Sequence, residues 1–227
     1  MTAPIKPPSA VILRWGLVMI LAIAFGYIEA AVVVYLRQIF HPNGFNFPLA
    51  AYFLADNSRN LLLVEVGREA ATLVLLLSVC LLSGQSRPQR LAYFITIFAV
   101  WDIFYYVWLK VILDWPASIM DWDVLFLIPL PWAGPVLAPL LISLTLLVFA
   151  GIILYRDYKA NPIKVSLWDW LGFCTAALLV VISFFIAGRY ITQPDYASYF
   201  SWLFFAAGLL AAIALFVKCL YRPNDAL

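Results

Sequence analysis

The chain has 227 residues, of which 66% are apolar and only 11% are charged, and its mean hydropathy is +0.98. Soluble domains are about half apolar and about a quarter charged. The composition therefore excludes an ordinary soluble protein and predicts a single integral membrane domain over residues 1–227. The net charge of +2 is small and the basic residues are scattered, so we expect the lipid bilayer, and not nucleic acid, as the main partner.

Six apolar runs are each long enough to cross a bilayer as a helix, which needs roughly 20 residues. They cover about residues 12–36, 61–82, 91–113, 135–155, 168–187 and 202–220. The expected fold class is therefore all-α, a polytopic membrane helical bundle of about six transmembrane helices.

Two of the connections between these runs are not simple turns. The first contains the apolar patch Leu49–Leu54, which is too short to span and is typical of an outer interfacial helix. The second contains the apolar run Val124–Leu130, which is interrupted by prolines. It predicts a Pro-rich re-entrant or interfacial element, whose irregular backbone must be covered by protein or line a wet cavity. A long fourth helix that begins near Val124 is the alternative, and the sequence leaves both open.

The basic residues are divided unequally between the two sides of the membrane that six spans define. The side with both termini carries nine: Lys6, Arg14, Arg87, Arg90, Arg156, Lys159, Lys164, Lys218 and Arg222. The other side carries four: Arg37, Arg59, Lys110 and Arg189. Because basic residues favour the cytoplasmic side, we expect a multi-pass protein of the cell (inner) membrane with both termini in the cytoplasm. The two irregular connections then face outward.

Four acidic residues lie within the predicted spans: Glu29, Glu65, Glu69 and Asp102. At 1.5 Å per residue they lie roughly 6–16 Å below the outer ends of their helices. Ionisable groups in a bilayer usually face the bundle interior or a water-filled pathway. Three different spans therefore direct acids into one layer, which is the most informative pattern in the sequence.

The second span also carries Arg68. The i, i+3 and i+4 spacings put Glu65, Arg68, Glu69 and Thr72 on one helical face. Arg68 can form a bidentate pair with a carboxylate, and Arg37 can reach another acid. At least two carboxyl groups then have no basic partner. Because burial favours the neutral form of a carboxyl group, these are expected to carry a proton or hold a cation. A closed network that only fixes helix packing is the alternative.

Aromatic residues flank Asp102, among them Tyr105 and Tyr106. They are typical of an interfacial aromatic belt, and they can equally form a pocket wall that attracts cations. The predicted ligand-binding residues are Glu29, Glu65, Arg68, Glu69, Asp102, Tyr105 and Tyr106.

The remaining polar motifs do not predict a metal site or a cofactor. Asp121-Trp122-Asp123 has the spacing of a cation-binding pair, but helix-capping or solvent-exposed loop acids are the favoured interpretation. The single histidine, His41, is expected at the surface or the membrane interface. The three cysteines form no CxxC motif.

Three functions fit these features. The leading hypothesis is an outward-facing acidic pocket, held together by Arg68, that binds a proton, a cation or a small polar ligand, as in a small transporter. The second is an intramembrane enzyme that acts on a lipid or isoprenoid, with Asp102 or Glu69 as the general acid. The third is a non-catalytic subunit of a larger membrane complex. The small size of the bundle favours a homodimer for a transporter, and no catalytic residue is assigned.

Overall fold

The computed structural model describes residues 8–42, 44–49 and 59–222. Six helices in these ranges are long and apolar enough to cross a membrane. They are α1 (Pro8–Phe40), α2 (Arg59–Ser83), α3 (Arg87–Leu113), α4 (Leu137–Tyr158), α5 (Leu167–Gly188) and α6 (Trp202–Leu220). The prediction of six membrane-spanning helices is confirmed at this level. The structure extends the first helix beyond its predicted end, because no helix-breaking residue occurs between Leu36 and Phe40.

Local sequence explains where several helices begin. Ser86 caps α3 by accepting a hydrogen bond from the backbone N–H of Gln89, at 3.2 Å, and a proline follows in the first turn. Ser166 and Asp169 form a capping box at the start of α5. These polar caps satisfy backbone N–H groups that a helix leaves without an internal partner.

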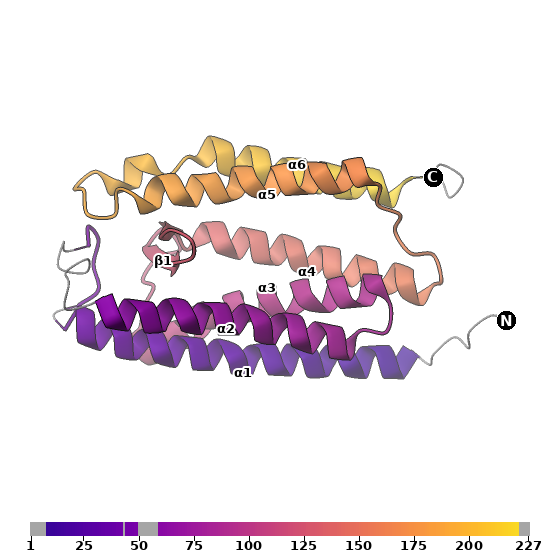
Figure 1. Cartoon of the computed structure of the whole chain (residues 1–227), viewed down its shortest axis with the longest axis horizontal. Coiled ribbons are helices and arrows are strands. Elements are labelled where there is room, and N and C mark those ends of the chain that lie inside the picture. Colours follow the sequence, from indigo (N-terminus) through magenta and orange to yellow (C-terminus); the bar gives the residue numbers. More distant parts are fainter. Residues whose placement is uncertain (1–7, 43, 50–58, 223–227) are drawn as a thin grey trace.

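The helices are arranged around α3, which packs against α1 and α4 and also contacts α2. Helices α5 and α6 pack mainly against each other and form a separate layer, seen at the top of Figure 1. Helix α1 begins and α6 ends at the same end of the bundle, on the right of Figure 1. We call this the terminal end and the opposite one the hairpin end.

A small β-hairpin lies at the hairpin end and precedes α4. Strand β1 (Trp122–Phe126) pairs antiparallel with β2 (Trp132–Pro135). The alternative prediction of a fourth helix from Val124 is wrong, since α4 begins at Leu137. Prolines in the turn lack the N–H that a helix requires, whereas the short ladder pairs part of the backbone. The re-entrant or interfacial position of this segment stays a prediction.

The hairpin connects the α5–α6 layer to the rest of the bundle. Strand β2 packs on α5, where a Cβ atom at Gly188 would lie 1.9 Å from the carbonyl oxygen of Pro131. Only glycine permits this close approach of two backbones. The Leu49 N–H donates to the Ile191 carbonyl, at 2.7 Å, and adds a second link. Apart from Leu49, the predicted interfacial helix Leu49–Leu54 lies outside the described residues.

Candidate functional site

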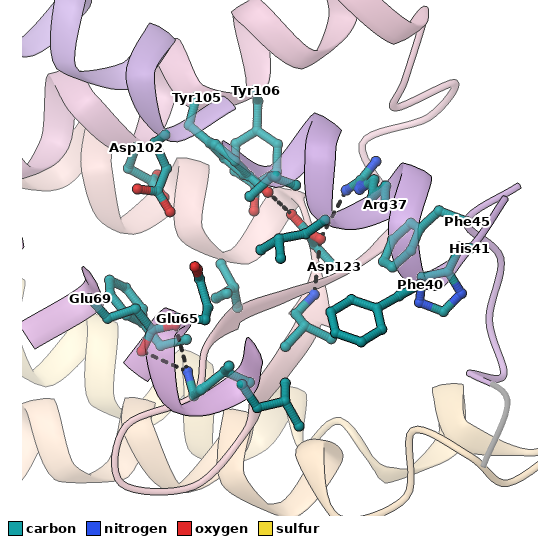
Figure 2. Close-up of a pocket in the computed structure, with 18 of the residues that line it drawn as sticks. Arg37, Phe40, His41, Phe45, Glu65, Glu69, Asp102, Tyr105, Tyr106 and Asp123 are labelled. Atoms are coloured by element: carbon teal, nitrogen blue, oxygen red, sulfur yellow. Dashed lines mark hydrogen bonds and ion pairs between the residues drawn. The ribbon is translucent and has the colours of Figure 1, made fainter. Parts of the chain in front are cut away.

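A pocket with several acidic residues in a largely apolar wall lies at the hairpin end, between α1, α2, α3 and the hairpin, with a cavity volume of about 110 Å³. Figure 2 shows acidic side chains from different elements around it. Its walls include six of the predicted ligand-binding residues: Glu29, Glu65, Glu69, Asp102, Tyr105 and Tyr106. The seventh, Arg68, is not part of the wall but contacts two of these acids. We call this cavity the acidic pocket.

Arg68 joins two carboxylates from different helices. Its Nη2 donates to Glu29 on α1 at 2.7 Å, and its Nε donates to Glu65 on α2 at 2.9 Å. It makes a second contact with each carboxylate, so both pairs are bidentate. One guanidinium group therefore holds two acids, and the Glu29–Arg68 pair ties α1 to α2.

A second ion pair closes the pocket on the side of the hairpin. Arg37, at the end of α1, donates to Asp123 of β1 at 3.1 Å, and the Tyr105 hydroxyl donates to the other oxygen of Asp123 at 3.0 Å. The Arg37 guanidinium also lies over the rings of Phe45 and Trp115, with distances to the ring centroids of 4.0 and 3.8 Å. Cation–π contacts of this kind stabilise a charge that has lost its water.

Two predictions about these residues need correction. Asp123 is not a solvent-exposed or capping loop acid, because only 2% of its surface is exposed, and Arg37 pairs with it rather than with one of the four span acids. Burial raises the pKa of the Asp123 carboxyl, and the neighbouring Arg37 and Tyr105 oppose that shift. By contrast, Asp121 accepts hydrogen bonds from the backbone of Ala117 and behaves as a loop cap.

His41 is also more enclosed than predicted. It lines the acidic pocket and is buried beside Phe45, with an edge-to-face ring contact at 5.3 Å between centroids. Burial and the positive charge of Arg37 both lower the pKa of His41, which favours a neutral imidazole near pH 7. A surface position is therefore wrong for this side chain.

Glu69 and Asp102 differ from the other three acids of the described pocket wall, because each has only neutral donors. The Glu69 carboxylate accepts from the backbone N–H of Leu127, in the hairpin turn, at 2.9 and 3.0 Å. Asp102 on α3 accepts from the hydroxyl of Ser143 on α4 at 2.8 Å. Within residues 8–42, 44–49 and 59–222, neither carboxyl group has a basic side chain at ion-pair distance.

Two further polar atoms of the pocket wall have no hydrogen-bond partner in the described part of the chain. They are the indole Nε1 of Trp101 and the hydroxyl of Tyr106. The two residues are only 5% and 4% exposed. Buried polar groups are normally paired, because an unpaired one costs about 1–3 kcal/mol. The wall therefore offers carboxyl oxygens together with unused hydrogen-bonding groups, which is the chemistry of a binding site for a polar group.

Neither a metal site nor a similarity to known proteins assigns a function to this pocket. Across the residues that the structure describes, no group of three His, Cys, Asp or Glu side chains is arranged to hold a metal ion. Comparisons of the chain with protein-family models, with curated proteins and with solved structures find no match.

Proposed function

We propose that this membrane protein binds a proton or a small polar group with hydrogen-bond donors in the acidic pocket, as a small transporter would. Glu69 and Asp102 are the binding groups in this proposal. The observation that carries it is the lack of an ion-pair partner for these two carboxyl groups in the described chain, although two guanidinium groups lie around the same pocket. A carboxyl group in such a place is neutral or holds a cation.

The other charged residues have a supporting role in this proposal. Glu29 and Glu65 share Arg68, and Asp123 is engaged by Arg37. These pairs fix α1, α2 and the hairpin around the cavity. The unpaired groups of Trp101 and Tyr106 then contribute hydrogen bonds to whatever Glu69 and Asp102 bind.

We further propose that the hairpin end faces outward and that both termini are cytoplasmic. The nine-to-four division of basic residues supports this orientation. The test uses a variant without the native cysteines, into which Gln85→Cys or Ser118→Cys is introduced; both positions are exposed, at opposite ends of the bundle. A membrane-impermeant thiol reagent added outside intact cells should label Ser118→Cys only. Labelling of Gln85→Cys alone would invert the topology.

The binding proposal is tested by infrared titration of the protein in lipid nanodiscs, from about pH 4 to about pH 9, the range of perturbed carboxyl groups. The wild type should show a carboxyl C=O band that titrates with pH. The band should weaken in Glu69→Gln and in Asp102→Asn, because each variant removes one protonatable group. Asp169→Asn is the control, since Asp169 lies at the terminal end and is paired with Lys218 and Arg222.

Binding of a small ligand is measured in parallel with propylamine as the probe. Propylamine should raise the melting temperature of the wild type. It should not change the melting temperature of the double variant that carries both Glu69→Gln and Asp102→Asn. The proposal is contradicted if the C=O band is unchanged in both single variants and the wild type does not respond to propylamine. The acids would then only stabilise the packing of the helices. The subunit hypothesis would then replace this proposal.

A further inference from the structure

A second and much larger cavity lies beside the acidic pocket, between the α3–α4 and α5–α6 helix pairs. Its volume is about 810 Å³, within the range of about 300–1,000 Å³ that is typical of sites for drug-sized ligands. Most of its wall is apolar, with residues such as Leu91, Ile142, Phe149, Val180 and Leu209. We call this cavity the apolar chamber.

The chamber has the length and the opening that a hydrocarbon chain requires. Its wall includes Arg87 and Asp102, which lie fifteen residues apart on α3, or about 22 Å at 1.5 Å per residue. This exceeds half of the hydrocarbon thickness of about 30 Å, which is the length of one lipid chain. The chamber is not fully enclosed, and Trp170 and Ala177 on α5 are exposed where they line it, so a chain can enter it from the side of α5.

The two cavities meet at one acidic residue. Phe98, Asp102, Leu125 and Phe126 line both of them. Asp102 is the only acid in the described chamber wall, and its partner Ser143 lines the chamber as well. The other end of the chamber has Arg87. A molecule whose chain lies in the chamber and whose head carries hydrogen-bond donors therefore has a matching acceptor at Asp102, at the entrance to the acidic pocket.

A protein helix fits this space less well than a lipid chain. The chamber wall includes Leu125 and Trp132 of the hairpin at one end, and Pro162 and Ile163 of the α4–α5 connection at the other. A spanning helix would have to pass through both ends, and with side chains its diameter is about 10–12 Å. A flexible chain that enters from the side meets neither obstacle.

We propose that the apolar chamber and the acidic pocket together bind one amphipathic membrane molecule with a single acyl or isoprenoid chain and an amino or hydroxyl head. The chain lies in the chamber, and the head reaches Asp102 and Glu69. The choice of head rests on the proposed function of the acidic pocket. Acidic side chains repel a negatively charged head, so an amine should bind better than an alcohol, and an alcohol better than a fatty acid.

The test measures competition for a fluorescent long-chain alkylamine bound to the full-length protein in nanodiscs. Ala212→Trp places a large side chain in the chamber, and Ala214→Trp is its matched control because Ala214 is exposed on the same helix and does not line the chamber. Ala212→Trp should weaken alkylamine binding roughly tenfold, the effect of displacing about two methylene groups from an apolar site. Ala214→Trp should leave binding unchanged.

The head is tested with Asp102→Asn. This variant should keep the binding of the chain but lose the preference for the amine over the matched alcohol. If Ala212→Trp fails to fold, Ala177→Trp replaces it, with Leu178→Trp as the control, because Ala177 lines the chamber and Leu178 is exposed outside it.

The outcomes separate this inference from the proposed function. Propylamine binding in the wild type, with no gain from a longer chain and no effect of Ala212→Trp, would overturn the lipid inference and leave the acidic pocket as proposed. Chain binding that is sensitive to Ala212→Trp but equal for amine, alcohol and acid would overturn the role of the acidic pocket. In a third outcome, Ala212→Trp disrupts an oligomer and leaves alkylamine binding unchanged. The chamber would then bind another protein chain, and the inference would be wrong.

Discussion

Asp169 at the terminal end of the bundle and two acids at the hairpin end, Glu69 and Asp102, have opposite kinds of partners. At the terminal end, Asp169 accepts hydrogen bonds from Lys218 and Arg222, each at 3.0 Å, and from the capping residue Ser166. At the hairpin end, Glu69 has one backbone N–H donor and Asp102 has one hydroxyl donor. Asp169 is surrounded by cations and donors, as expected of a carboxylate that stabilises the fold. The neutral and sparse partners of Glu69 and Asp102 distinguish them from Asp169.

The largest effect is expected from Arg37→Ala, which removes the cation beside a buried acid. Breaking a buried pair by deleting one partner costs about 3–5 kcal/mol, and the contacts with Phe45 and Trp115 are lost as well. Burial already raises the pKa of Asp123, and loss of Arg37 raises it further. A raised carboxyl pKa gives stability at low pH that is lost as the pH rises through it. The destabilisation should therefore grow from about pH 4 upward, as measured by thermal unfolding in detergent. A loss that is independent of pH would contradict this role of the pair.

Arg68→Ala should come next, because Arg68 is partly exposed but holds two carboxylates. We expect a loss toward the lower end of about 3–5 kcal/mol at pH 8, measured by chemical unfolding. Without Arg68, the carboxylates of Glu29 and Glu65 lose the cation that they share. Arg68→Lys is the control, because it keeps the charge without the bidentate geometry. Its free energy of unfolding should lie between those of the wild type and Arg68→Ala. An Arg68→Ala protein as stable as the wild type would show that the network does not hold α1 to α2.

Asp169→Asn should lower the melting temperature by only a few degrees, although this acid has more partners. Lys218 is largely exposed, and a pair that water and salt can screen contributes little. The loss therefore comes mainly from the less exposed pair with Arg222, and the amide in Asp169→Asn keeps the shape of the side chain and an oxygen acceptor for it. The same variant should leave the infrared C=O titration and propylamine binding unchanged, since the terminal end has no part in either. A change in either readout would remove the distinction between the two ends.

The smallest effect on stability is expected from Glu69→Gln. The amide oxygen can still accept the hydrogen bond of the Leu127 N–H, so the loss should be below about 1 kcal/mol. Thermal unfolding of this variant beside Arg68→Ala measures the difference directly. If Glu69→Gln were as unstable as Arg68→Ala, Glu69 would be a structural acid like Asp169.

The features that local sequence determines could be predicted. Apolar runs indicate the six helices because a spanning helix satisfies its own backbone, and the rise per residue puts Glu29, Glu69 and Asp102 in one layer. Asp123 was missed because its position depends on strand pairing, which a short proline-containing segment does not reveal. A signal was available in Arg37, a cation at a helix end whose partner had to come from another segment. The apolar chamber has no local signal, since the space between two helix pairs is a property of their packing.

The position of the hairpin has a consequence for the order of events during biosynthesis. Strand β2 packs on α5, with the backbone of Pro131 against Gly188, and the turn between the strands carries the N–H that binds Glu69. The ribosome completes α1 to α4 before it reaches α5, and domains form as their segments emerge. The five acids in the described wall of the pocket are therefore synthesised before the surface on which the hairpin docks. The acidic pocket reaches its final form only after α5 has entered the membrane, so the last third of the chain controls when the site matures.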